Sequence, residues 1–214
     1  MSSFDWRGFL KKWSQDALAY AQDLDDLDAE VFNSEWLGYE GASEEQIVAV
    51  ESRLSVRLPP SYREFLKVSN GWRQTTPFIY RILSIEEVDQ FATKHADWML
   101  SFYQRFNCNP SLISANNCCN GTSSGYSISD FEYFTYGKRQ DCRKIRLEYL
   151  QSCLYISEKG ESCIYLLNPK VINHHQEWEA WFLGDWLPGA DRYPSFQAMM
   201  EAEYINFLEM RDIS

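Results

Sequence analysis

The side chains with the chemistry for catalysis or metal binding show no spacing that is typical of an active site. The candidates for a zinc site are Cys108, Cys118, Cys119, Cys142, His174 and His175. No pair among them has C-x-x-C or H-x(3–5)-H spacing, and the adjacent Cys118 and Cys119 cannot readily share one tetrahedral ion. Cys153 and Cys163 stand in apolar, strand-like segments, where buried thiols are expected. We therefore expect no metal and no cofactor.

A cysteine or serine nucleophile would need a base beside it in the folded chain. Of the three histidines, His95 falls in a helical pattern and the His174-His175 pair in a loop-like one, so the spacing selects no Cys–His pair. A thiol enzyme stays open as a minor alternative. The sequence also lacks the G-x-S-x-G, P-loop and G-x-G-x-x-G motifs. We interpret the chain as non-enzymatic.

The charge of the chain is concentrated in its N-terminal third. Ten carboxylates and no lysine or arginine lie between Gln22 and Ser52, and the whole chain has a net charge of -11. This balance disfavours direct nucleic-acid binding, because phosphate contacts need lysine and arginine. An acidic face suits a basic protein partner, whose association it would speed. A solvated face that only keeps the protein soluble is an equally good interpretation.

Three further segments have features of binding surfaces. Trp178, Trp181 and Trp186 lie within nine residues and are either interface anchors or a lid of tryptophans over a sheet. Residues 138–146 contain five basic side chains and one acidic one, which would bind an anion or pair with the chain's own carboxylates. Residues 107–125 have the composition of a long loop, and such loops are often functional.

The length and composition predict a globular protein. A chain of 214 residues with 45% hydrophobic and 16% aromatic side chains can bury a sizeable core. The N-terminal residues have no apolar region typical of a signal peptide, and no stretch approaches the roughly 18 apolar residues of a membrane span. We therefore expect a cytoplasmic protein that has no membrane contact and keeps its cysteines reduced.

Two short amphipathic helices are predicted in tandem between residues 41 and 72. Ser43 and Gln46 form a capping-box pattern, and apolar residues then recur at helical spacing through Leu54. Pro60 suits the first turn of the second helix. The Asn70-Gly71 pair is predicted to end that helix in the left-handed conformation.

The rest of the chain predicts helices towards both ends and strands between them. The expected elements are a helix capped by Ser2 or Ser3 and reaching Leu24, an acidic connector over 23–40, a strand over 77–83, a helix over 86–106, strands over 126–128, 132–136, 154–157 and 163–167, and a helix that starts at Pro194-Ser195 and reaches Leu208. A turn at 158–161 makes the last two strands a hairpin. This order predicts an α+β fold with a mostly antiparallel twisted sheet and helices packed on it.

Several of these segments carry a family resemblance. The stretches ASEEQI, LPPSYREFL and SNGW, between residues 42 and 72, resemble the signature of the Smi/Knr-like domain of the SUKH superfamily. Residues 82–88 resemble the strand-into-helix segment that follows the signature, and residues 153–157, 165–169 and 178–182 resemble the later strands and Trp-rich turn. The resemblance implies a Smi/Knr-like domain over 41–214. We expect the helix and acidic connector of 1–40 to pack on it as part of a single globular unit.

The resemblance also implies a function, because proteins similar to this one act by binding other proteins. The bacterial ones are mostly immunity proteins that neutralise secreted toxins, and a fungal one regulates cell-wall synthesis. We expect an immunity protein whose partner is a cognate toxin, such as a basic nuclease or another cytosol-acting enzyme. A scaffold or regulator of cell-wall synthesis or signalling is the alternative. The predicted contact residues are Asp25, Asp26, Asp28, Trp36, Glu44 and Glu45.

Overall fold

The computed structural model describes residues 4–19, 29–106 and 128–211. Its centre is a five-stranded antiparallel sheet with the strand order β3-β4-β5-β6-β7. These strands are β3 Asp89–Gln90, β4 Leu154–Tyr155, β5 Cys163–Ile172, β6 Trp178–Gly184 and β7 Ala190–Tyr193. A separate hairpin pairs β1 Trp72–Thr76 with β2 Ile79–Ile82. Helices pack around antiparallel sheets, which confirms the predicted α+β fold.

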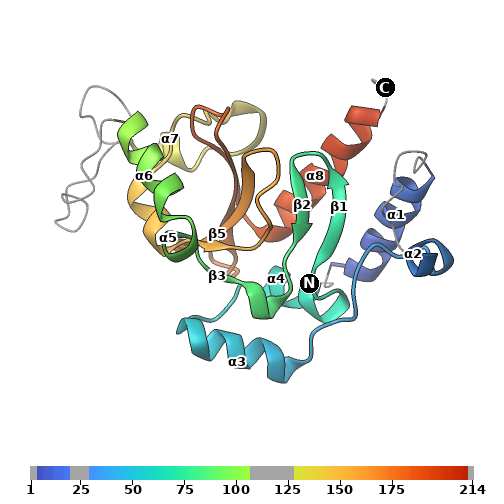
Figure 1. Ribbon diagram of the computed structural model, residues 1–214. Coiled ribbons are helices and arrows are strands. Elements are labelled where there is room, and N and C mark those ends of the chain that lie inside the picture. The colour runs from blue at the N-terminus through green and yellow to red at the C-terminus, as the bar shows by residue number, and fades with distance from the viewer. Residues whose placement is uncertain (1–3, 20–28, 107–127, 212–214) are drawn as a thin grey trace.

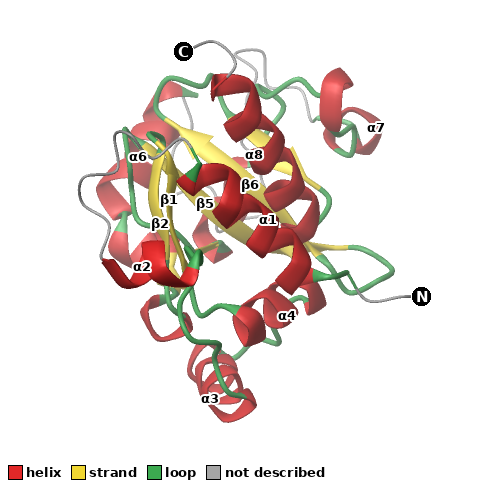
Figure 2. Ribbon diagram, turned by 90° about the vertical axis from the view of Figure 1, so that its right-hand side faces the viewer, coloured by secondary structure: helices red, strands yellow, loops and turns green. Residues whose placement is uncertain are grey.

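Helices cover both faces of the large sheet. The helices are α1 Trp6–Leu18, α2 Ala29–Ser34, α3 Glu44–Leu54, α4 Pro60–Val68, α5 Phe91–Lys94, α6 Ala96–Arg105, α7 Asp130–Tyr133 and α8 Phe196–Arg211, with 3-10 turns η2 Ile85–Glu87, η4 Gly137–Arg139 and η5 Leu147–Ser152. Figure 1 shows α5 and α6 on one side of the sheet and α8, the β1–β2 hairpin and α1 on the other. Figure 2 shows α1, α4 and α8 in front of β5 and β6.

The two covered faces explain why β5 and β6 are buried along most of their length. Successive side chains of a strand point to opposite faces. Tyr165 and Leu167 of β5 therefore join the core under α1, α4 and α8. Ile164 and Leu166 join a second core under α5, α6 and η5. Strands buried on both faces read as continuous apolar runs, and Cys163–Leu167 is such a run.

The helical pair between residues 41 and 72 is confirmed. Ser43 caps α3 in a complete capping box. Its hydroxyl accepts a hydrogen bond from the backbone N–H of Gln46 at 3.3 Å, and the side-chain oxygen Oε1 of Gln46 accepts one from the backbone N–H of Ser43 at 2.8 Å. Pro60 is the first residue of α4, as predicted. The end of α4 differs from the prediction, because Ser69 leaves the helix in an extended conformation. Gly71, with φ +113°, instead starts the path into β1.

Helix α1 confirms the predicted apolar stripe but begins at another cap. Trp6, Leu10 and Trp13 are buried against the rest of the protein. The Asp5 carboxylate accepts a hydrogen bond from the Gly8 N–H at 3.0 Å and caps the helix. The prediction of a cap at Ser2 or Ser3 was therefore wrong. Aspartate at this position also stabilises the positive end of the helix dipole.

The expected strand over 77–83 is confirmed in part, because β2 spans Ile79–Ile82 while residues 77–78 form the turn of the β1–β2 hairpin. Two other element predictions were wrong. The expected helix over 86–106 is broken into η2, β3, α5 and α6, since β3 pairs with β4 at the sheet edge. The expected strand over 132–136 is the short helix α7, which Ser129 caps. Of the predicted strand over 126–128, residues 126 and 127 lie outside the described residues, and residue 128 is in no strand.

The later strands agree better with the sequence. β4 pairs antiparallel with β5 across residues 156–162, which confirms the predicted hairpin. The expected Trp-rich turn begins later than predicted, because residues 178–184 form β6. The helix predicted after Pro194-Ser195 is α8, which continues beyond the predicted end to Arg211.

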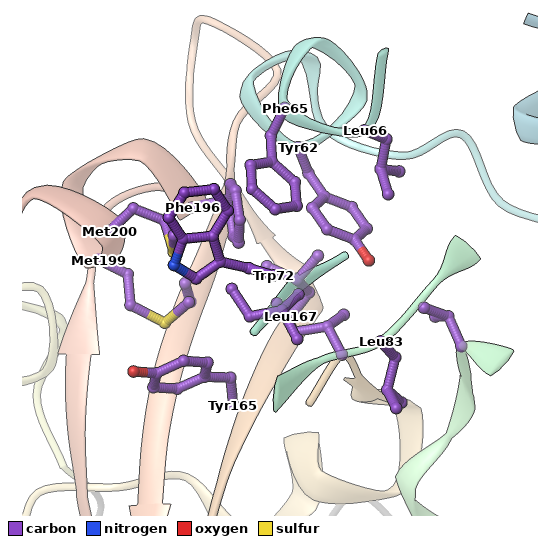
Figure 3. Packing of buried hydrophobic residues seen from close by; sticks show 14 of the residues in the cluster. Tyr62, Phe65, Leu66, Trp72, Leu83, Tyr165, Leu167, Phe196, Met199 and Met200 are labelled. Carbon is purple, nitrogen blue, oxygen red and sulfur yellow. The ribbon is translucent and has the colours of Figure 1, made fainter. Parts of the chain in front are cut away.

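An aromatic cluster joins the N-terminal helix to the two helices that cover the sheet. Phe196, the first residue of α8, contacts Trp6 of α1 at a ring-centroid distance of 5.6 Å. It contacts Tyr62 and Phe65 of α4 at 4.8 and 5.1 Å. Figure 3 shows Phe196 next to Tyr62, Phe65 and Trp72 in the core. The Tyr62 contact is edge-to-face and the other two are tilted, and these ring contacts add to the burial of four large side chains at one point.

We predict that Phe196→Ala destabilises the fold by about 3–5 kcal/mol, the cost of truncating a fully buried phenylalanine. The free energy of unfolding is measured by urea denaturation. Ile205→Ala is the matched control, because Ile205 lies on the same helix and its side chain is 54% exposed. It should change stability by no more than about 0.5 kcal/mol. Equal effects of the two substitutions would contradict this role of the cluster.

Candidate protein-binding surface

The structure describes three of the six predicted contact residues. Trp36 lies two residues after α2, and Glu44 and Glu45 lie in the first turn of α3. Asp25, Asp26 and Asp28 lie outside the described residues. Trp36 and Glu44 line two different hollows, so the structure does not place the described contact residues in one cavity.

Trp36 lines a hollow of about 530 Å³ between α1, α2, α4 and β1. Its lining residues are Arg7, Glu30, Val31, Ser34, Trp36, Gly38, Tyr39, Glu40, Gly41, Val68 and Arg73. Glu30, Trp36, Tyr39 and Glu40 line this hollow, and the exposed Phe32 and Glu35 belong to the same segment of the chain. We call these six residues together the connector surface. Phe32 is 44% exposed and Tyr39 36% exposed, which is unusual for large apolar rings.

The segment that carries Trp36 is held in place by backbone hydrogen bonds to buried serines. The Leu37 N–H donates to the hydroxyl of Ser14 on α1 at 3.0 Å. The Tyr39 N–H donates to the hydroxyl of Ser69, just after α4, at 2.9 Å. Both serine residues are fully buried. The connector surface is therefore pre-ordered, and a partner would not have to fix this backbone on binding.

Aromatic and cationic groups orient the rings of the connector surface. The Trp36 ring packs edge-on against the core residue Trp72 at a centroid distance of 5.7 Å. The Arg73 guanidinium lies 4.2 Å from the centre of the Tyr39 ring, and it also donates to the Leu37 and Gly38 carbonyl oxygens at 3.2 and 2.7 Å. Arg73 thus fixes the backbone of residues 37 and 38 and the ring of Tyr39.

Within the described part of the chain, the carboxylates of the connector surface form no ion pair. Glu30, Glu35 and Glu40 are exposed, and none forms an ion pair with a described residue. Their negative charge is therefore directed to solvent or to a partner. The sequence suggested an acidic face over the whole N-terminal third. The structure distinguishes these unpaired carboxylates from others in the same third that are already paired.

Glu44 is one of the paired carboxylates. It forms ion pairs with Arg63 and, at 3.3 Å, with Lys67 of α4. It lines a second hollow of about 640 Å³, together with Arg57 and Trp178 among others. Glu45 is exposed, and its pKa is lowered by hydrogen bonds from its own backbone N–H and from Ser43. Both carboxylates lie at the positive, N-terminal end of the α3 dipole, so they also stabilise this helix.

The basic segment 138–146 pairs mostly with carboxylates of the chain itself. Arg146 and Lys144 contact Asp130 and Glu132 of α7 at 2.5 and 3.1 Å. Arg143 forms a 2.9 Å pair with Asp141. These contacts favour the structural interpretation of the segment over an anion site. The loop-like segment 107–125, the other open feature of the sequence, lies outside the described residues.

The tryptophans of the C-terminal third divide between the two interpretations left open by the sequence. Trp178 and Trp181 are buried in β6, as a tryptophan lid over the sheet requires. Trp186 follows β6 and is 57% exposed.

The most polar constellation in the interior surrounds Glu179 and Arg192, which are both fully buried and 3.2 Å apart. The Glu179 carboxylate also accepts hydrogen bonds from Tyr133, Tyr136, Asn168 and Trp181 at 2.6–3.0 Å. Burial raises the pKa of both tyrosines. Because both oxygens of the Glu179 carboxylate are engaged and solvent is excluded, this network holds α7 and η4 against the sheet. Nε and Nη2 of Arg192 have no hydrogen-bond partner among the described residues.

The described thiols and histidines form no catalytic arrangement. Burial raises the pKa of Cys153 and Cys163, which disfavours the reactive thiolate. Burial lowers the pKa of His95, whose ring packs on Phe91 and Tyr155. Within the described ranges, no group of three or more His, Cys, Asp or Glu side chains could hold a metal ion. No helix of those ranges is long and apolar enough to cross a membrane.

Fold and surface together define a class: an α+β domain that presents ordered aromatic and acidic side chains. Comparison with protein families makes this specific, because the model of the SMI1 / KNR4 family (SUKH-1) matches residues 41–202. The chain belongs to the SMI1/KNR4 family, and the resemblance seen in the sequence is confirmed. The match starts at the end of the connector surface, so most of that surface precedes the family domain. A search of the curated proteins returns no match.

We predict that Glu179→Ala lowers the free energy of unfolding by about 3–5 kcal/mol, because it leaves Arg192 buried without its counter-charge. Urea denaturation measures the change. Glu132→Ala is the control: it removes an exposed carboxylate from its ion pair with Lys144 and from its capping box, and it should lower stability much less than Glu179→Ala. A loss at Glu179 no larger than that at Glu132 would contradict the structural role of the network.

Proposed function

We propose that this protein is a non-catalytic immunity protein that binds a cognate bacterial toxin in the cytoplasm and neutralises it. Membership of the SMI1/KNR4 family supports action through a protein partner. The observation that carries the proposal is the connector surface, where three unpaired carboxylates surround ordered aromatic rings. A basic toxin, such as a nuclease, is the partner that this surface fits best.

The surface has the composition of a protein interface. Aromatic residues are enriched among the few side chains that carry most of the binding energy at interfaces. Trp36 is half-buried and held against Trp72, so it offers a rigid edge at little entropic cost. Glu30, Glu35 and Glu40 add the negative field that speeds association with a basic partner. The acidic residues Asp25, Asp26 and Asp28 directly precede α2 in sequence and would extend that field.

Neutralisation follows from the charge of such a partner. A nuclease needs a basic surface to hold phosphates. An acidic inhibitor that occupies that surface competes with the substrate, and it needs no chemistry of its own. Family membership also fits a regulator of cell-wall synthesis or signalling, which would use the same surface on an endogenous partner.

Affinity purification from the native host separates the two roles. The tagged protein is used as bait, and the bound proteins are identified by mass spectrometry. A one-to-one partner whose expression alone kills cells, and which this protein makes harmless, supports the immunity role. Recovery of only envelope or signalling proteins supports the regulator instead. A bait with Glu30, Glu35 and Glu40 changed to lysine identifies which captured proteins depend on the connector surface.

We predict that the triple variant Glu30→Lys, Glu35→Lys and Glu40→Lys slows association with the partner at least about tenfold in 50 mM salt and much less in 1 M salt. Association and dissociation rates are measured by surface plasmon resonance. Reversal of Asp25, Asp26 and Asp28 should act in the same direction. Glu201→Lys is the control, because Glu201 is exposed on α8 and lines neither the connector surface nor the second hollow.

Trp36→Ala should instead speed dissociation, because it removes an anchor rather than a charge. Circular dichroism verifies that this variant is folded. An association rate that is the same for the triple variant, Glu201→Lys and the unaltered protein would overturn the placement of the interface.

A further inference from the structure

A third hollow combines aromatic walls with carboxylates and is distinct from both the connector surface and the second hollow at Glu44. It has a volume of about 320 Å³ and lies where the β1–β2 turn, the end of the large sheet and α8 meet. Phe78, Phe182, Trp186, Asp191, Glu203, Asn206, Glu209 and Met210 line it. We call it the aromatic–carboxylate pocket. It shares no lining residue with the hollow at Trp36.

Three rings from different parts of the chain form the aromatic side of the pocket. Trp186 lies 5.8 Å from Phe78 and 6.0 Å from Phe182, and the two phenylalanines are 6.4 Å apart, measured between ring centroids. The indole N–H of Trp186 donates to the Cys163 sulfur at 3.1 Å, which orients the ring. Trp186 is nevertheless 57% exposed. A large ring that is both oriented and exposed is available to a ligand.

Glu203 supplies the buried charge of the pocket. Its side chain is 4% exposed, and its carboxylate accepts hydrogen bonds from Tyr165 at 2.7 Å, Asn206 at 3.1 Å and Tyr193 at 3.5 Å. Those donors are neutral. A carboxylate buried at this depth without a counter-charge is uncommon, because desolvation penalises its ionised form.

The other acidic groups of the pocket increase this imbalance. Asp191 of β7 is half-buried, and Glu209 of α8 is exposed. Burial raises the pKa of Glu203 and of Asp191. The charge of Asp191 raises the pKa of Glu203 further, whereas the neighbouring Arg192 acts against the rise at Asp191. Among the described residues, no lysine or arginine lines the pocket. A cation that entered would therefore meet negative charge that nothing in the pocket compensates.

We infer that the aromatic–carboxylate pocket receives a cationic side chain, a lysine or an arginine, from a protein partner. Cations bind the faces of aromatic rings, most strongly that of tryptophan, and a carboxylate beside the rings strengthens the attraction. The long aliphatic stem of either side chain would pack on Phe78 and Phe182 while its charged head meets Glu203. The inference deepens the proposed function, because a basic toxin is rich in such side chains.

Other occupants fit the pocket less well. An apolar group would bury the Glu203 and Asp191 carboxylates without any compensation. A metal ion would need several oxygen, nitrogen or sulfur ligands at one point, whereas aromatic rings form one side of this pocket. Cationic side chains satisfy both halves of the lining, the rings and the carboxylates.

The test uses capped tripeptides and therefore needs no identified toxin. The probes are N-acetylated, C-amidated Gly-Lys-Gly, Gly-Arg-Gly and the uncharged Gly-norleucine-Gly, titrated to about 20 mM to cover the millimolar affinities expected of one side chain. Two-dimensional NMR follows the tryptophan indole N–H signals, and the Trp186 signal is assigned from its loss in Trp186→Phe. We expect the lysine or the arginine peptide to shift that signal saturably and the norleucine peptide to leave it unchanged.

Two variants test the lining, and one controls for general effects. Glu203→Gln keeps the size of the side chain and an oxygen that accepts from Tyr165, but it removes the charge; it should weaken binding at least about fivefold. Trp186→Ala removes an exposed ring and should abolish binding; because this variant lacks the indole reporter, its binding is followed by saturation-transfer difference NMR on the signals of the peptides. Glu201→Gln, on the same helix but outside the pocket, should bind as the unaltered protein does.

Two results would overturn the inference. One is a norleucine peptide that binds as tightly as the lysine peptide, since the pocket would then be merely apolar. The other is the absence of saturable shifts for both cationic peptides. Neither result would contradict the proposed role of the connector surface, which is tested with the toxin and with other variants. A failure of the immunity role, in turn, would leave binding of the peptides unaffected.

Discussion

The contact of Phe196 with Trp6, Tyr62 and Phe65 is the interaction on which the arrangement of this protein most depends. It joins α1, α4 and α8, which are far apart in the sequence, at one buried point. Dispersion and burial at three large rings together outweigh any single polar contact on the surface. Because α1 is held there, the hydroxyl of its buried Ser14 accepts the hydrogen bond from the Leu37 N–H and positions the connector surface beside α4. The placement of the candidate interface is thus a consequence of core packing.

The sheet imposes the second constraint. It is covered on both faces, so the polar groups buried beneath the helices need partners inside the protein. Glu179 of β6 finds them in Arg192 and in tyrosine, tryptophan and asparagine donors. Arg192 of the edge strand β7 pairs with Glu179 but keeps its Nε and Nη2 without a hydrogen-bond partner in the described part of the chain. The buried carboxylate of Glu203 on α8 accepts hydrogen bonds only from neutral donors, and the aromatic–carboxylate pocket that it lines is bordered by the exposed Trp186. Two buried glutamates in one fold therefore differ in role: one is paired and structural, and the other lacks a counter-charge at the edge of a hollow.

Much of the fold was predictable because its local signals are strong. The Ser43 capping box, Pro60 and the apolar stripes of α1, α3, α4 and α8 are local patterns, and tertiary packing did not overturn them. The segment 86–106 was mispredicted because β3 exists only through its pairing with β4, more than sixty residues later. The candidate site was predictable in part. Trp36 was selected as an anchor from its type and its acidic neighbours, whereas nothing local showed that Glu44 pairs with Arg63 and Lys67.

By itself, the sequence determined the α+β class, the family and the acidic character of the N-terminal third, because caps, periodicity and net charge are properties of neighbouring residues. Only the tertiary structure decided which charges are available to a partner. Glu30, Glu35 and Glu40 are unpaired, whereas the carboxylates of α3 that face α4 are not. It also decided that Phe78, Trp186 and Glu203, spread over more than a hundred residues, line one pocket. The physical reason is the same in both cases: ion pairing, burial and cavity formation depend on distances between elements, and local sequence does not encode those distances.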